Sequence, residues 1–248
     1  MLLDEKIEIP RRTMVLFFVI DTSGSMDGSK IGAVNTAIEE VIPAIREVSD
    51  ENADAQIKIA ALEFSSGATW ITKSGPVEAE HFRWNYLEAA GVTDLGAACK
   101  SLNEKLSTKE FMKEATGSFA PAIFLLSDGD PTDDWQKGLE TLKQNNWFKA
   151  AIKVAVAIGD GANKDVLKAF TGSMEAVLEV HNAAMLKKMI KFVSVRASQV
   201  ASKSSNVSAG GAEGAGDEQK QHDLNANLAE FKEEIAASSD ASSDDGDW

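Results

Sequence analysis

Residues 13–25, TMVLFFVIDTSGS, decide the fold of this chain. The segment Thr13–Ile20 is apolar almost throughout and rich in β-branched and aromatic side chains. A strand of this composition is covered on both faces, as in a parallel sheet flanked by helices. The apolar run ends at Asp21, and a polar, glycine-containing stretch follows. We therefore expect a buried strand over 13–20 with a polar loop at its carboxyl end.

Strand-like and helical segments alternate after this strand. Apolar residues at spacings of three and four predict a helix over 30–48, which Pro43 is expected to kink or shorten. The predicted strands 56–64 and 68–72 are joined by a short Ser-Ser-Gly turn, so we expect them to pair antiparallel. The other expected strands are 122–126, 152–158 and 176–180; the other expected helices are 95–106, 133–145, 164–170 and 183–200; a long connection is expected over 76–91. This order predicts an α/β fold with a doubly wound, mostly parallel central sheet and helices on both faces.

The negative charge of the chain is concentrated in its last fifth. The 248 residues include 39 acidic and 25 basic side chains, for a formal net charge of −14. Residues 197–248 contain 11 acidic residues and three lysines, a net charge of −8. Nucleic acid binding depends on Lys and Arg, and anionic membranes repel acidic proteins. We therefore expect neither nucleic acid nor membrane as a partner.

Composition divides the chain into three parts. We predict an N-terminal extension over 1–12, a globular domain over 13–197 and a flexible Ser/Gly/Ala-rich acidic tail over 198–248. Four apolar residues of the tail recur at helical spacing: Leu224, Leu228, Phe231 and Ile235. They predict a short amphipathic helix over 223–237, which either docks on the domain or a partner, or forms only transiently.

The cysteine content and the first residues bear on the cellular compartment. The single cysteine, Cys99, excludes an intrachain disulfide and is expected to be a small buried thiol. The opening MLLDEKIEIPRR places acidic residues where a signal peptide needs basic ones, and the longest apolar run, 14–20, is too short to span a bilayer. We expect a cytoplasmic protein.

Polar residues gather where the predicted strands end. Asp21, Ser23 and Ser25 follow the first strand at alternate positions, Thr93 precedes a helix, and Asp128 follows the strand at 122–126. Ligands of open α/β sheets bind outside the carboxyl ends of the strands. Hydroxyl and carboxylate oxygens with no soft ligand nearby suit Mg²⁺, and Mn²⁺ or Ca²⁺ less selectively. These five residues are our predicted metal ligands, although Ser and Asp also serve as helix caps and Asp-Gly marks turns.

The segment Asp21–Ser25 resembles the DxSxS motif of von Willebrand factor A (vWA) domains, which opens their metal-ion-dependent adhesion site (MIDAS). Thr93 and Asp128 match the threonine and the aspartate of the second and third elements of that site. The resemblance covers residues 11–196 and implies a Rossmann-like vWA fold with one antiparallel edge strand.

The resemblance also implies roles for these residues. Ser23, Ser25 and Thr93 would bind the metal directly through their hydroxyls, and Asp21 and Asp128 would bind mostly through water. An Asp or Glu from a protein partner would then fill the open position on the metal.

The longer phrase over 15–43, VLFFVIDTSGSMDGSKIGAVNTAIEEVIP, resembles bacterial vWA proteins of the TerY type, which are associated with tellurite resistance. That group is associated with a protein kinase and a PP2C-type phosphatase. The resemblance therefore implies a Ser/Thr kinase and a PP2C-type phosphatase as partners, in a bacterial stress, signalling or defence system.

Five further residues lie in or near the site-forming loops and are candidates for the rim of a ligand site: Asp27, Asp130, Trp84, Tyr86 and Trp135. The alternative is that the acidic residues are solvated loop or cap residues and that the aromatic residues belong to the core. Asp133 is expected to cap the helix that follows it or to add favourable charge there.

An enzymatic function is less consistent with the sequence. A haloacid-dehalogenase-type phosphohydrolase also places an Asp after its first strand, but it needs a second carboxylate two residues later, where this chain has Ser23. The chain contains no P-loop GxxxxGK[ST]. We expect a metal-dependent protein-binding module that is not an enzyme. The alternative is a scaffold that acts through the acidic, Trp-ended stretch Asp244–Trp248.

Overall fold

The computed structural model describes residues 11–53, 55–113 and 117–180, together with short stretches between 182 and 195 and between 222 and 233. The predicted N-terminal extension up to residue 10 lies outside the described residues. So do the tail residues 198–221 and 234–248, which include the end of the predicted helix and the acidic stretch before Trp248.

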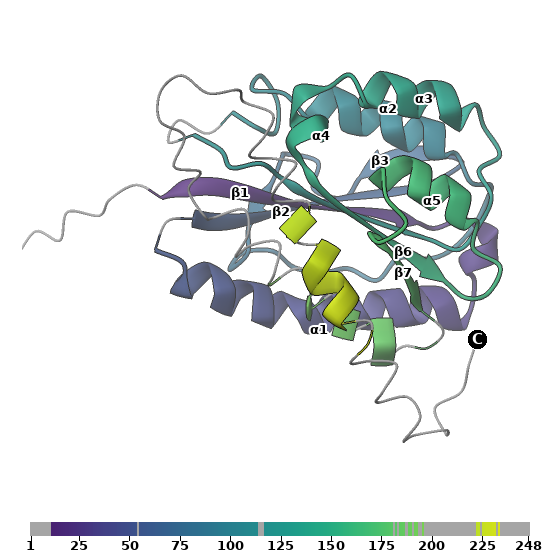
Figure 1. Cartoon of the computed structure of the whole chain (residues 1–248), viewed down its shortest axis with the longest axis horizontal. Coiled ribbons are helices and arrows are strands. Elements are labelled where there is room, and N and C mark those ends of the chain that lie inside the picture. Colours follow the sequence, from purple (N-terminus) through teal and green to yellow (C-terminus); the bar gives the residue numbers. More distant parts are fainter. Residues whose placement is uncertain are drawn as a thin grey trace, which may run out of the picture.

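A seven-stranded sheet forms the centre of the molecule, with the order β3-β2-β1-β5-β6-β7 and with β4 also paired to β2 (Figure 1). Strands β1, β2, β5, β6 and β7 are parallel to one another, whereas β3 and β4 are antiparallel to β2. The strands are β1 (Arg12–Asp21), β2 (Ala55–Ser65), β3 (Gly67–Trp70), β4 (Val77–Glu78), β5 (Ala122–Ser127), β6 (Ile152–Ile158) and β7 (Val177–Val180). The predicted α/β fold and the antiparallel edge hairpin are confirmed.

Helices cover both faces of this sheet (Figure 1). Helix α1 lies on one face, and α2, α3, α4 and α5 supply the apolar side chains that pack on the other. The bounds are η1 (Gly24–Met26), α1 (Ser29–Glu51), α2 (Leu95–Lys105), α3 (Trp135–Leu142), α4 (Asn146–Ala150) and α5 (Lys164–Thr171). Among the described residues, no helix has both the length and the apolarity needed to cross a bilayer.

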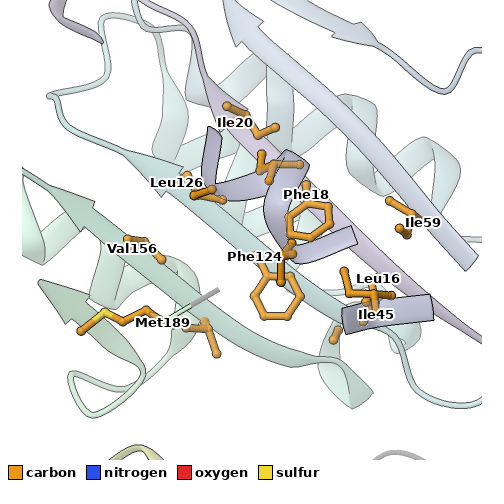
Figure 2. Packing of buried hydrophobic residues seen from close by; sticks show 14 of the residues in the cluster. Leu16, Phe18, Ile20, Ile45, Ile59, Phe124, Leu126, Val156 and Met189 are labelled. Carbon is orange, nitrogen blue, oxygen red and sulfur yellow. The ribbon is translucent and has the colours of Figure 1, made fainter. Parts of the chain in front are cut away.

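Strand β1 is buried on both faces because alternate residues enter two separate cores. Leu16, Phe18 and Ile20 point to the α1 side, where Phe18 stacks on Phe124 with ring centroids 5.4 Å apart (Figure 2). Phe17 and its neighbours point to the opposite side. Burying one such side chain stabilises the fold by about 1.5–3 kcal/mol. The unbroken apolar run therefore places β1 in the middle of the sheet.

Helix α1 continues through Pro43 and ends at Glu51, so the expectation that Pro43 shortens it is wrong. Proline removes the hydrogen bond to the carbonyl four residues earlier, which here belongs to Glu39. Pro43 is exposed, and so is Glu39, so water can satisfy that carbonyl.

Two local predictions also differ from the structure. The helix expected over 133–145 is shorter, since α3 spans only Trp135–Leu142. A further helix that was not predicted, α4, follows it, because Asn145 accepts hydrogen bonds from the main-chain N–H groups of Trp147 and Phe148. The connection expected over 76–91 contains β4, whose two residues pair with β2.

The described part of the tail packs on the α1 face of the domain. Residues 225–231 are helical, and Leu228 is fully buried in the core on that face. Phe231 stacks on Phe192 with centroids 3.9 Å apart and an interplanar angle of 2°. Asn225 Nδ2 donates to Glu175 Oε2 at 3.4 Å. Leu228 and Phe231 of the predicted helix therefore face the domain, whereas Leu224 and Ile235 lie outside the described residues.

Candidate metal site

Three loops meet at the carboxyl ends of β1 and β5. The chain leaves β1 for α1 on one face of the sheet, whereas it leaves β5 for α3 on the other face. Because the chain departs in opposite directions from two adjacent strands, a crevice opens between their ends. The loop at 21–26 enters this crevice from β1, the loop at 127–130 enters it from β5, and the segment at 90–94 approaches from before α2.

Main-chain hydrogen bonds hold the first loop in place. Thr22 N donates to Phe64 O at 2.8 Å, which ties the loop to the end of β2. Ala90 N donates to Thr22 O at 2.8 Å, and Gly24 N donates to Gly91 O at 3.0 Å. These main-chain bonds therefore hold the loop in its conformation without a contribution from a bound ion.

The segment 91–94 depends on a glycine and on its own set of bonds. Gly91 has φ of +83°, and a Cβ there would lie 2.5 Å from Ser66 Oγ, so a side chain at this position would be strained. Thr132 N donates to Thr93 O at 2.8 Å, and Asp94 N donates to the main chain at Ser65. These contacts fix the position of Thr93 beside the other two loops.

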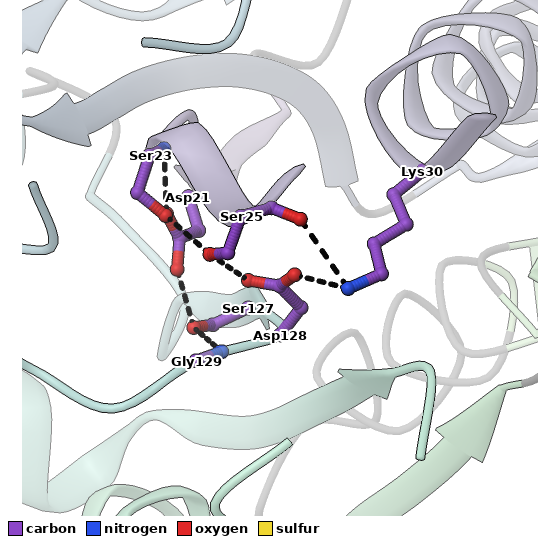
Figure 3. Close-up of polar contacts among 7 residues, drawn as sticks. All are labelled: Asp21, Ser23, Ser25, Lys30, Ser127, Asp128 and Gly129. Carbon is purple, nitrogen blue, oxygen red and sulfur yellow. Dashed lines mark hydrogen bonds and ion pairs between the residues drawn. The ribbon is translucent and has the colours of Figure 1, made fainter. Parts of the chain in front are cut away.

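The Asp21 carboxylate is the buried part of the site and connects the loops that follow β1 and β5. It is fully buried and accepts hydrogen bonds from Ser23 N at 2.9 Å and from Ser127 Oγ at 2.6 Å (Figure 3). Burial raises the pKa of Asp21, the two hydrogen-bonding serines oppose that rise, and the nearby charge of Asp128 adds to it. Each oxygen of this carboxylate is thus held by a defined donor.

The remaining predicted ligands come together beside Asp21. Ser23 Oγ and Ser25 Oγ lie 3.0 Å apart, and Ser25 Oγ donates to Asp128 Oδ1 at 2.7 Å (Figure 3). A Cβ built on Gly129 would lie 3.4 Å from Ser25 Oγ and 3.9 Å from Thr93 Oγ1, so both hydroxyls face the same glycine. The structure thus gathers all five predicted residues.

Lys30 also belongs to this cluster, and the sequence prediction missed it. Its ammonium forms an ion pair with Asp128 Oδ2 and donates to Ser25 O at 3.3 Å (Figure 3). The Lys30 side chain is 23% exposed, whereas that of Asp128 is fully buried. The signal available in the sequence was the position of Lys30 in the first turn of α1, five residues after Ser25.

The oxygen atoms fit a small, hard cation. Adjacent ligands of an octahedral Mg²⁺ with bonds of about 2.1 Å lie about 3.0 Å apart. The Ser23–Ser25 and Ser25–Asp128 oxygen separations of 3.0 and 2.7 Å match that spacing. Within the described part of the chain, no group of three or more His, Cys, Asp or Glu side chains could hold a metal. Metal binding at this edge would therefore depend on hydroxyls.

Comparison with known proteins identifies the family. The sequence model of the von Willebrand factor type A domain matches residues 16–192. The chain belongs to the vWA family. A search of curated proteins found no match.

Solved vWA-like structures share the fold of this domain. A von Willebrand factor type A protein from Catenulispora acidiphila is 18% identical, with a TM-score of 0.56 over 75% of this chain and 43% of its own. The pilus adhesin SpaC from Lactobacillus rhamnosus GG is 12% identical, with a TM-score of 0.58 over 77% of this chain and 31% of its own. Proximal thread matrix protein 1 from the mussel byssus, solved with a zinc-occupied MIDAS motif, is 17% identical, with a TM-score of 0.54 over 74% and 47%. This chain therefore spans less than half the length of these proteins.

The acidic rim candidates of this vWA domain lie in the loops that follow η1 and β5. Asp27 is exposed just after η1, and Asp130 accepts a hydrogen bond from Asn163 Nδ2. Asp133 is different, because its carboxylate accepts from the N–H groups of Gly96 and Ala97, both at 2.9 Å. Asp133 therefore caps α2, which precedes it in the chain.

The aromatic rim candidates of the vWA domain have separate attachments. Trp84 packs against the α1-face core and donates from Nε1 to Asn35 Oδ1 at 3.2 Å. Tyr86 is 60% exposed and donates to Glu39 Oε2 at 2.6 Å, which raises the pKa of its phenol. Trp135 begins α3 and packs on the opposite core. Trp84 and Tyr86 therefore lie along α1, and their described bonds go to that helix.

Asn35 is a second residue that the sequence prediction missed. It is buried in α1, accepts from Leu87 N at 2.8 Å and donates to Leu87 O at 2.9 Å. Through these bonds and the one from Trp84, it holds the segment that leads to Gly91 against the helix. An asparagine on an otherwise apolar helix face was the signal that could have identified it.

Proposed function

We propose that this vWA domain is a metal-dependent protein-interaction module that binds an Asp or Glu side chain of a partner through Mg²⁺. Domains of this family generally serve as adhesion or protein-interaction modules, often through a metal site. The observation that carries the proposal is the contact chain of Ser23 Oγ, Ser25 Oγ and Asp128 Oδ1 beside the buried Asp21. Hydroxyls of Ser23, Ser25 and Thr93 would hold the ion directly, with the two carboxylates behind them.

The charge of this ligand set favours an acidic partner. Hydroxyl ligands are neutral, so an ion held mainly by them keeps most of its positive charge. When bound, the ion would supply a Lewis-acidic position for a carboxylate from outside. The two aspartates are hydrogen-bonded within the domain, where Ser127 and Ser23 hold Asp21, and Ser25 and Lys30 hold Asp128. Together with the Lys30 ammonium, a divalent ion and the two aspartates would carry one net positive charge, which a carboxylate from a partner would balance.

Calorimetric titration of metals into the full chain tests the first half of the proposal. Mg²⁺, Mn²⁺ and Ca²⁺ are compared, and Zn²⁺ is included because a zinc-occupied MIDAS occurs in the mussel protein. We expect Mg²⁺ or Mn²⁺ to bind, because both are hard cations that accept oxygen ligands. The double variant Ser23→Ala with Ser25→Ala should lose binding, whereas Ser74→Ala, a change at an exposed serine, should not.

Partner capture tests the second half. The full chain is used as bait in the presence of Mg²⁺ or EDTA, and the double serine variant serves as a folded, metal-deficient bait. Partners that need both the metal and the serines support the proposal. Their acidic residues can then be replaced by amides to identify the carboxylate. Capture that is equal with EDTA and with the double variant would show that this site does not mediate binding.

We also propose, from the resemblance of residues 15–43 alone, that the chain is a cytoplasmic TerY-like module without catalytic activity of its own. Its partners would then include a Ser/Thr kinase and a PP2C-type phosphatase in a bacterial stress, signalling or defence system. Mass spectrometry of the Mg²⁺-dependent captured fraction tests this assignment. A fraction that lacks both enzymes would contradict it and leave the metal-dependent interaction intact.

A further inference from the structure

One charged contact at the site involves a residue outside the proposed ligand set. The Lys30 ammonium is paired with Asp128 Oδ2, while Asp128 Oδ1 accepts from Ser25 Oγ. The same ammonium donates to the main-chain oxygen of Ser25 at 3.3 Å. A positive side chain thus touches two of the five proposed ligand residues (Figure 3).

The Lys30–Asp128 ion pair stabilises the fold because the carboxylate of Asp128 is buried. The Asp128 side chain is fully buried, and a buried carboxylate without a counter-charge is strongly destabilised. Lys30 supplies that counter-charge. A divalent cation on Ser23 and Ser25 would supply the same compensation from the other side of the carboxylate. The two cations therefore share one anion, and they repel each other at short range.

We propose that Lys30 acts as a tethered cation that competes with the divalent metal for Asp128 and so sets the metal affinity of this site. The inference rests on the proposed metal-binding function. The ammonium weakens binding of the metal because either Lys30 leaves Asp128 when the metal binds, or both positive charges remain close together. Lys30 can leave, because its side chain is partly exposed and its long stem can carry the ammonium into water.

Lys30→Met tests the competition directly, since it keeps most of the stem and removes the charge. The measurement is the Mg²⁺ and Mn²⁺ dissociation constant of the full chain at fixed ionic strength. We expect Lys30→Met to bind metal about tenfold more tightly than wild type, because the repulsion between the two cations is gone. Lys30→Arg keeps the charge and should stay within about threefold of wild type. Lys73→Met, at an exposed lysine in the loop after β3, controls for the change in net charge.

A second readout distinguishes competition from a merely structural role. Without added metal, Lys30→Met should melt at a lower temperature than wild type, because Asp128 loses its counter-charge and keeps only the hydrogen bond from Ser25 Oγ. Saturating Mg²⁺ should raise its melting temperature by more than it raises that of wild type. Lys30→Gln is the second neutral variant, since its amide can still donate to Asp128 and support folding. A purely structural lysine would lower stability without tightening metal binding.

The outcomes separate this inference from the proposed function. Tighter binding by both neutral variants, with unchanged binding by Lys73→Met, supports the competition. Equal or weaker binding by both neutral variants overturns it, and the proposed metal-dependent function then stands alone. Absence of metal binding in wild type and in all variants overturns the proposed function and this inference together.

Discussion

Ser127 Oγ donates a hydrogen bond of 2.6 Å to Asp21 Oδ2, and this bond joins the last residues of β5 and β1. The two strands are neighbours in the sheet, although their last residues are 106 positions apart in sequence. Asp21 is fully buried, so each donor that it keeps offsets part of the cost of removing its charge from water.

Replacing Ser127 by alanine should destabilise the domain. The carboxylate of Asp21 would keep the bond from Ser23 N and lose its hydroxyl donor, and the pKa of Asp21 would rise further because that donor lowers it. We expect Ser127→Ala to reduce the free energy of unfolding by about 1–3 kcal/mol. Urea denaturation at neutral pH measures the change, and Ser74→Ala, at an exposed position, should stay close to wild type. Equal stability of the two variants would contradict this account of Asp21.

Asn35→Ala should weaken the attachment of the segment before Gly91. It removes the acceptor for Leu87 N and the donor to Leu87 O, and it leaves both main-chain groups short of a partner. The expected loss in the free energy of unfolding is about 2–4 kcal/mol. Thr36→Ala is the neighbouring control, because Thr36 is exposed and its hydroxyl donates to Gly32 O in the same helix. The prediction fails if the two substitutions cost the same.

A charge at position 228 should release the described tail segment from the domain. Leu228 is buried in the α1-face core, whereas its neighbour Ala229 is exposed. We expect Leu228→Asp to reduce the free energy of unfolding by about 2–4 kcal/mol, since it removes an apolar contact and would bury a carboxylate. Hydrogen exchange should accelerate across 222–233 while β2 stays protected. Ala229→Asp should leave both quantities unchanged, and faster exchange in that control would mean that the segment is not docked by Leu228.

The thiol of Cys99 should be inert in the folded protein. Burial raises the pKa of Cys99 to about 12, and the nearby charge of Asp133 raises it as well. Iodoacetamide at pH 8 should modify Cys99 only after unfolding. Above the ordinary thiol pKa of 9.0, the unfolded chain releases this proton and the folded chain keeps it, so stability is lost as the pH rises toward 12.

Comparing the free energy of unfolding of wild type and Cys99→Ala between pH 9 and 11 isolates the contribution of the Cys99 thiol, since the two proteins share all other titrating groups. The advantage of wild type over the variant should shrink by up to about 1.4 kcal/mol for each pH unit in that range. A constant difference would show that Cys99 titrates alike in the folded and unfolded chains.

The sheet could be predicted from the sequence because its signals are local. The apolar run over 13–20 needs two covered faces, and the short turn at 65–67 brings the flanking strands together as a hairpin. Helix α4 was missed because its start depends on Asn145, whose role as a cap is visible only when its bonds to the following N–H groups are known.

The sequence was sufficient to place the candidate ligands at one edge of the sheet, but it did not identify the charged side chain that pairs with them. The alternation of strands and helices predicts that the parallel strands end at the same edge of the sheet, and the observed strand order places Asp21 and Asp128 on neighbouring strands. The pairing of Lys30 with Asp128 spans 98 positions and depends on the direction of the first turn of α1. Asp133 shows the same limit, since it caps a helix that precedes it in the chain.

The main-chain bonds from Thr22 and Gly24 hold the loop of the candidate site in one conformation before anything binds there. They fix the loop without using any of the proposed ligand oxygens. Ordering a loop residue costs about 1–2 kcal/mol of conformational free energy, and here that cost is met when the chain folds. The loop is therefore preorganised, and an ion or a partner bound there would not require it to refold.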